Sequence, residues 1–200
     1  MRKLWLSAEY NEELEALLSI ISESSDGLIL SSDTAEEAVR IYLVTDKESL
    51  ALKLMAFRGE KISSESLNRA VMELTPRNTD FSASGADIII DTSSLDFRNA
   101  ADIVLSAFTE YDGGAFALFS EDKLNFPDDE ADSELISSFS EMPDSDLPMA
   151  DAVYKDGELY IVSLPEATLA RTFFADGLIP HRLVEKDISD IKFVKMKNSL

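Results

Sequence analysis

The chain has 200 residues, of which 39 are acidic and 18 are basic, so its formal net charge is −21. A hydrophobic content of 45% supports a buried core and excludes a largely disordered chain. No run reaches the roughly 18 apolar residues of a membrane-spanning helix. The charge argues against direct binding to nucleic acid or to an anionic membrane, and it favours a protein partner with a basic surface.

The sequence gives indications of the compartment. It contains no cysteine, so it has neither disulfides nor thiolate metal sites, which is typical of a reducing cytoplasm. The basic start, residues 1–3, is followed by only three apolar residues, 4–6, before Glu9, which is too short for a signal peptide. We therefore expect a cytoplasmic protein without a secretion signal.

Strands and helices are predicted to alternate in the first half of the chain. Strands are expected over residues 3–6, 28–30, 39–44 and 86–92, and helices over residues 8–22, 46–57, 64–74 and 96–108. Gly59 should end the second helix, and Ser63 or Ser64 should cap the third. Because parallel strands need crossover connections, this order predicts an α/β fold with a mainly parallel sheet flanked by helices.

The first predicted helix, residues 8–22, is amphipathic. Its apolar residues recur at helical spacing and should face the core, whereas its glutamates should take up the rest of the helix. The apolar residues are Leu14, Leu17, Leu18 and Ile21, and the glutamates are Glu9, Glu12, Glu13 and Glu15.

The pattern changes beyond residue 112, where the α/β domain of residues 1–112 is expected to end. After an alternating run at 115–119, residues 121–151 hold eleven acidic residues against a single lysine. Residues 113–151 are therefore interpreted as an acidic, proline-containing loop or linker. A small β-rich α+β module should follow over residues 152–200, with an Asp-Gly hairpin between 152–154 and 159–162, a helix over 165–174 and a last strand over 191–196.

Three segments carry a family resemblance: VRIYLVT at 39–45, RNTDFS at 77–82 and ADIIIDTSSL at 86–95. The region from 27 to 108 resembles the second half of cytidylate kinases and related P-loop nucleoside monophosphate kinases. The first segment looks like the strand that leads into the lid helix, and the second is similar to an Arg-Asp-x-x-Asp-Ser segment. The third looks like the strand and turn that open the last helix.

The chain departs from this family where phosphate would bind. No Gly-rich Walker A loop follows the first strand; residues 7–13 read SAEYNEE, which places carboxylates where phosphates would sit. In the stretch that corresponds to the arginine-rich lid, residues 49–57 supply only Lys53, with Arg58 just after, and Ala83-Ser84 stand where a further arginine is expected. The resemblance thus implies a retained fold and a lost phosphoryl-transfer site.

An acidic run and the single histidine are two further candidate sites. The acidic run Asp128, Asp129, Glu130, Asp132 and Glu134 is a predicted interaction surface; it lacks the glycine and the final glutamate of an EF-hand, so no metal site is predicted. His181, the single histidine, has no nucleophile motif beside it and is interpreted as a surface or capping residue.

We predict a noncatalytic, acidic protein-interaction protein with a degenerate kinase-like domain and no cofactor. One alternative is a nucleotide-binding phosphotransferase with an unrecognised phosphate site, for which Arg69, Arg77 and Asp80 are the candidates. A second alternative is an acidic inhibitor or immunity-type protein that mimics nucleic acid on a basic target.

Overall fold

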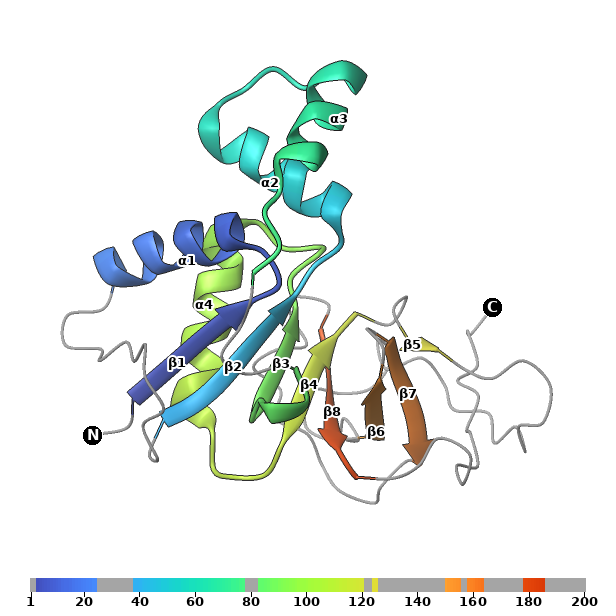
Figure 1. The fold of residues 1–200 in the computed structure, drawn as a ribbon. Coiled ribbons are helices and arrows are strands. Elements are labelled where there is room, and N and C mark those ends of the chain that lie inside the picture. The colour runs from blue at the N-terminus through green and yellow to red at the C-terminus, as the bar shows by residue number, and fades with distance from the viewer. Residues whose placement is uncertain are drawn as a thin grey trace, which may run out of the picture. The chain divides into compact units, whose positions relative to one another are not determined.

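The computed structural model describes residues 3–24, 38–77, 83–120, 124–125, 150–155, 158–163 and 178–185. The chain divides into two compact units, 1–113 and 114–200 (Figure 1). In the described ranges, no helix is both long and apolar enough to cross a membrane. The expected strands at 28–30 and 191–196, the helix at 165–174 and most of the acidic segment 121–151 lie outside these ranges.

The first unit is an α/β fold built on a parallel sheet. Strands β1 (Lys3–Ala8), β2 (Ala38–Val44) and β3 (Ile88–Asp91) lie in the order β1-β2-β3, with Leu6 opposite Ile41 and Ile41 opposite Ile88. The helices are α1 (Asn11–Ser24), α2 (Lys47–Arg58), α3 (Ser64–Glu73) and α4 (Phe97–Glu110), with a short 3-10 turn at Ala83–Gly85. The predicted alternation of parallel strands and helices is confirmed here.

The core of this unit lies between the sheet and the packed pair α1 and α4 (Figure 1). Strand β3 is buried along its whole length, whereas β2 alternates between buried and half-buried residues. On α1, Leu14, Leu17 and Ile21 are buried as predicted, while Leu18 is half-buried. The helix begins at Asn11 rather than at residue 8 because β1 continues to Ala8, where it pairs with β2.

Helices α2 and α3 form a hairpin that extends beyond the carboxyl ends of the strands (Figure 1). Asp46 caps α2 by accepting a hydrogen bond from the Ser49 backbone N–H at 2.8 Å, and Gly59 ends it with a left-handed φ of 69°. Ser63 caps α3 in a capping box with Ser66. The predicted ends at Gly59 and Ser63 are confirmed, but α3 has no buried residue.

The second unit contains a mixed sheet. Its strands are β4 (Phe116–Phe119), β5 (Leu124–Asn125), β6 (Ala150–Lys155), β7 (Glu158–Ser163) and β8 (Ile179–Leu183), in the order β4-β8-β6-β7-β5. The predicted antiparallel pairing across Asp156-Gly157 is present as β6 and β7.

Strand β8 was not predicted, and it changes the interpretation of His181. The strand pairs antiparallel with β4 and parallel with β6, and Pro180 faces Leu118 in the register. His181 is completely buried, so the prediction of a surface or capping histidine was wrong. Proline disfavours strand assignments from sequence, and this is why the strand was missed.

Candidate functional site

The carboxyl ends of β1, β2 and β3 meet at one edge of the first unit's sheet. In open parallel sheets this edge is where ligands bind, because the loops that follow the strands project from it. Here the edge carries the turn from β1 into α1, the start of α2 after β2, and the turn Thr92–Asp96 that leads from β3 into α4. Three groups of contacts at this edge define the candidate site.

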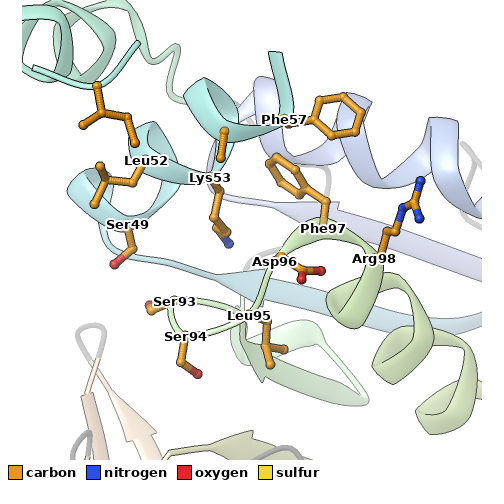
Figure 2. Close-up of a pocket in the computed structure, with 12 residues that line it drawn as sticks. Ser49, Leu52, Lys53, Phe57, Ser93, Ser94, Leu95, Asp96, Phe97 and Arg98 are labelled. Atoms are coloured by element: carbon orange, nitrogen blue, oxygen red, sulfur yellow. The ribbon is translucent and has the colours of Figure 1, made fainter. Parts of the chain in front are cut away.

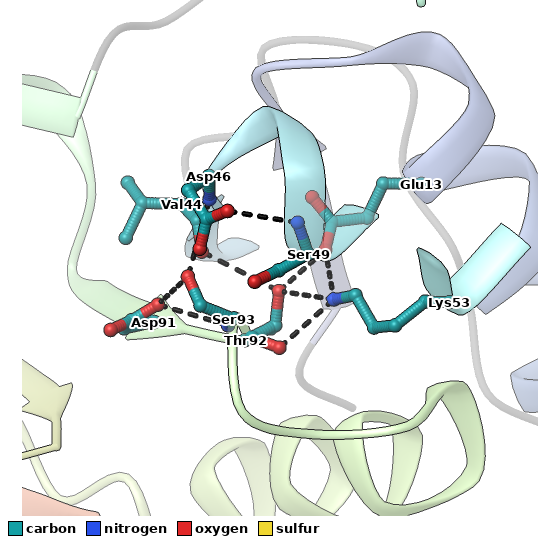
Figure 3. A network of polar contacts seen from close by, with 8 residues as sticks. All are labelled: Glu13, Val44, Asp46, Ser49, Lys53, Asp91, Thr92 and Ser93. Carbon is teal, nitrogen blue, oxygen red and sulfur yellow. Dashed lines mark hydrogen bonds and ion pairs between the residues drawn. The ribbon is translucent and has the colours of Figure 1, made fainter. Parts of the chain in front are cut away.

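The first group is a buried polar network of Glu13, Lys53 and Thr92 (Figure 3). The Lys53 ammonium donates to Glu13 Oε1 at 3.3 Å, to the Thr92 carbonyl oxygen at 2.9 Å and to Thr92 Oγ1 at 3.1 Å. The Thr92 hydroxyl donates to the same Glu13 oxygen. The glutamate side chain is fully buried and the lysine side chain is 9% exposed, so this ion pair is shielded from water. It ties α1 and α2 to the end of β3.

Burial acts in opposite directions on the two charged groups. It raises the pKa of Glu13, although Lys53 and the Thr92 hydroxyl partly offset this rise. Burial lowers the pKa of Lys53, and Glu13 is the main group that opposes this decrease. Among the described residues, Glu13 Oε2 has no hydrogen-bond partner. Burial of Glu13 and Lys53 therefore costs desolvation free energy that their mutual contacts only partly offset.

The second group fixes the turn after β3 against the start of α2 (Figure 3). The Ser93 backbone N–H and hydroxyl both donate to Asp91 Oδ1, at 3.0 and 2.6 Å. The Asp46 backbone N–H in turn donates to Ser93 Oγ at 3.2 Å. The turn is thus held by the Asp91 side chain and by the backbone of the loop that precedes α2.

The third group covers the turn from β1 into α1. The Asn11 backbone N–H donates to the Thr75 carbonyl at 3.2 Å, and the Arg77 backbone N–H donates to the Glu9 carbonyl at 2.9 Å. Both carboxylate oxygens of Glu12 accept from the Thr75 backbone N–H at 3.1 Å. The segment after α3 therefore lies along the N-terminus of α1, where an anion would otherwise bind.

Beside this network lies a cleft of about 630 Å³ in the first unit. One wall is a face of α2, and the other is the turn from β3 with the first residues of α4 (Figure 2). Ile62, in the connection between α2 and α3, completes the lining. The α2 residues are Ser49, Leu52, Lys53, Ala56 and Phe57, and the opposite wall runs from Ser93 to Arg98.

Aromatic side chains from the two walls meet in this cleft. The rings of Phe57 and Phe97 lie edge to face, with centroids 5.4 Å apart. Phe97 is buried, whereas Phe57 is 55% exposed and Ile62 is 54% exposed. Leu50, Leu54 and Phe57 recur at helical spacing along α2, but only the two leucines are buried.

The two predicted site residues that the structure describes, Arg69 and Arg77, do not line this cleft. Arg69 lies on α3 and forms an exposed ion pair with Glu65 at 3.5 Å, and Arg77 is exposed beside the turn from β1. Asp80 lies outside the described residues, and so do all five predicted interaction acids: Asp128, Asp129, Glu130, Asp132 and Glu134. The phosphate candidates and the interaction surface stay predictions.

Sequence reasoning missed the network that the structure brings together. Glu13 was assigned to the polar part of α1, but it is fully buried. Its ion-pair partner Lys53 is 40 positions away, and no local spacing connects the two. A signal was present for the cleft, since Leu52, Ala56 and Phe57 give α2 a second apolar face in addition to its buried one.

In the part of the chain that the structure describes, no group of three or more histidine, aspartate or glutamate side chains could hold a metal ion. No protein-family model matches the sequence, and no match was found among curated proteins or solved structures.

Proposed function

We propose that this chain is a noncatalytic protein that binds a protein partner with a basic surface, and that its first unit is a kinase-like scaffold without a phosphate site. The observation that supports this proposal is the covered N-terminus of α1. A phosphate there would have to displace the pairing of Thr75 with Asn11 and would meet the carboxylate of Glu12. Both the repulsion and the lost hydrogen bonds oppose nucleotide binding.

The distribution of charge supports a partner of opposite sign. Between Asp46 and Arg77 the chain has six basic and five acidic residues and is nearly neutral. The remainder of the chain has 34 acidic residues against 12 basic ones. Such a field attracts a basic surface over a distance set by the Debye length, about 10 Å at 0.1 M salt. The acidic inhibitor is a special case of this proposal, in which the basic partner is a protein that binds nucleic acid.

The absence of catalysis is tested by titrating the protein with ATP and with CMP in the presence of Mg²⁺. We expect no binding below about 1 mM, which corresponds to roughly −4 kcal/mol. Sub-millimolar binding of either nucleotide, or transfer of a phosphoryl group between them, would contradict the proposal and favour the phosphotransferase alternative with Arg69, Arg77 and Asp80.

The partner is tested by capture from cell extract at low salt, followed by elution with increasing salt. We expect a basic protein that elutes early in the gradient. Neutralising the five predicted interaction acids to Asn or Gln should abolish capture. A matched variant neutralises five exposed glutamates elsewhere, namely Glu15, Glu23, Glu48, Glu65 and Glu73, and should retain it. Equal loss in both variants would refute the assignment to residues 128–134, and capture of no basic protein would refute the proposed partner.

A further inference from the structure

Helix α2 has two apolar faces, and only one of them is covered. Its buried face consists of Leu50, Ala51, Leu54 and Met55. Its second face, which includes Leu52, Ala56 and Phe57, lines the 630 Å³ cleft. A helix that is apolar on both sides is normally covered on both sides. We therefore expect the cleft to bind a ligand that covers this second face with apolar atoms.

The cleft has the size and lining of a small-molecule site. Ligand pockets typically measure about 300–1,000 Å³ and combine apolar and aromatic walls with a few polar groups. Here Phe57 and Ile62, which are both more than half exposed and both line the cleft, offer apolar surface on which an aromatic or branched apolar body can pack. The floor is rigid, because the Lys53 ammonium is held by Glu13 and Thr92 and lies 5.4 Å from the Phe97 ring centroid.

One cationic side chain in the cleft, Arg98, has no ion-pair partner among the described residues. Arg98 is exposed in the first turn of α4. A cation is unfavourable at this position, since the N-terminus of a helix is already the positive end of its dipole. Figure 2 shows Arg98 next to Phe97 at one end of the cleft, with Ser49 at the other end.

We propose that this cleft binds a small organic acid with an aromatic or branched apolar body, and that Arg98 receives its acidic group. The body packs against Phe57, Phe97 and Ile62. The ligand carries a single acidic group rather than a polyphosphate, because the adjoining turn from β1 into α1 is closed by Thr75 and bears the Glu12 carboxylate. One wall of the cleft belongs to the nearly neutral stretch 46–77, and the charged residues of the whole lining are Lys53, Asp96 and Arg98, so the lining does not share the strong negative charge of the chain.

The test uses two fluorescent probes of similar shape, the anionic 1-anilinonaphthalene-8-sulfonate and the neutral N-phenyl-1-naphthylamine. We expect saturable binding of both to the folded protein. Ala56→Trp places an indole in the cleft from an exposed position on α2 and should abolish both signals. Met72→Trp is the matched control, because Met72 is 86% exposed on α3 and does not line the cleft. It should leave both affinities unchanged.

A second pair of variants separates the apolar contact from the charge. Phe57→Ser should weaken both probes about tenfold, as expected for the loss of roughly 50 Å² of apolar contact. Arg98→Gln should weaken only the anionic probe, whereas Arg69→Gln, at an exposed arginine outside the cleft, should change neither.

Far-UV circular dichroism confirms that each variant is folded. Absence of saturable binding of both probes, or an equal effect of Ala56→Trp and Met72→Trp, overturns the site. An Arg98→Gln variant that binds the anionic probe as tightly as the wild type overturns the assignment of an acidic ligand. Nucleotide binding is measured in a separate experiment. Absence of probe binding therefore leaves the proposed function intact, and binding of a nucleotide contradicts the proposed function without bearing on probe binding in the cleft.

Discussion

Replacement of Lys53 by methionine tests whether the buried ion pair at the sheet edge is organised as described. Methionine has nearly the same length and keeps the apolar contacts of the lysine stem, but it removes the ammonium that binds Glu13 and Thr92. Glu13 would then be a fully buried carboxylate with only the Thr92 hydroxyl as a donor. Removal of one partner from a buried pair typically costs about 3–5 kcal/mol of unfolding free energy.

The loss should depend on pH in a defined direction. Burial already raises the pKa of Glu13, and Lys53 is the largest influence that lowers it, so the substitution raises this pKa further. A carboxyl group with a raised folded pKa takes up a proton on folding, and stability falls as pH rises through that range. We therefore expect Lys53→Met to lose about 3 kcal/mol at pH 8 and clearly less at pH 5, where Glu13 is closer to being protonated.

Urea unfolding followed by the fluorescence of Trp5, the single tryptophan, measures this loss in the first unit. Lys61→Met at an exposed lysine is the control and should change stability by less than about 0.5 kcal/mol. The double variant Glu13→Gln/Lys53→Met should regain much of the loss, since no buried charge remains. A loss of less than about 1 kcal/mol at pH 8, or an equal loss at both pH values, would refute the reasoning.

Three further predictions concern stability and use the same unfolding assay. Asp87→Ala removes the carboxylate that accepts hydrogen bonds from the Arg40 guanidinium at 2.9 and 3.1 Å and from the Arg40 backbone N–H at 2.8 Å. Because the pair is partly exposed, we expect the free energy of unfolding to fall by only about 1 kcal/mol. No loss would show that solvent replaces these bonds. Gly59→Ala should cost about 1 kcal/mol from backbone strain alone, because φ is 69° and no atom lies within 4 Å of an added Cβ; an unchanged midpoint would contradict the left-handed cap. Asp96→Ala should cost about 1 kcal/mol through loss of the α4 cap at the Asn99 N–H, whereas Asp96→Asn should retain most of it.

Helix ends were predictable from sequence because their signals are local. Asp46, Gly59, Ser63 and Asp96 each act within a few positions of the helix that they begin or end, and the structure places all four at helix termini. The parallel sheet followed from the same alternation of short apolar runs and amphipathic stretches.

The site depends on contacts between distant positions, which a single sequence does not reveal. Glu13 meets Thr92 from 79 positions away, and a glutamate in an amphipathic helix is ordinarily solvated, so its burial had no local signal. Strand β8 was hidden by Pro180 for a similar reason: its neighbours β4 and β6, which supply the pairing, come from other parts of the chain.

Helix α3 is held differently from the rest of the first unit. Its ten residues include none that is buried, and a helix of this length is only marginally stable in water without tertiary support. Its capping box and its packing on α2 supply that support, while the core under β3 does not depend on it. We therefore expect the amides of α3 to exchange with solvent through local opening long before those of β3, so that this helix can be lost and regained while the sheet stays folded.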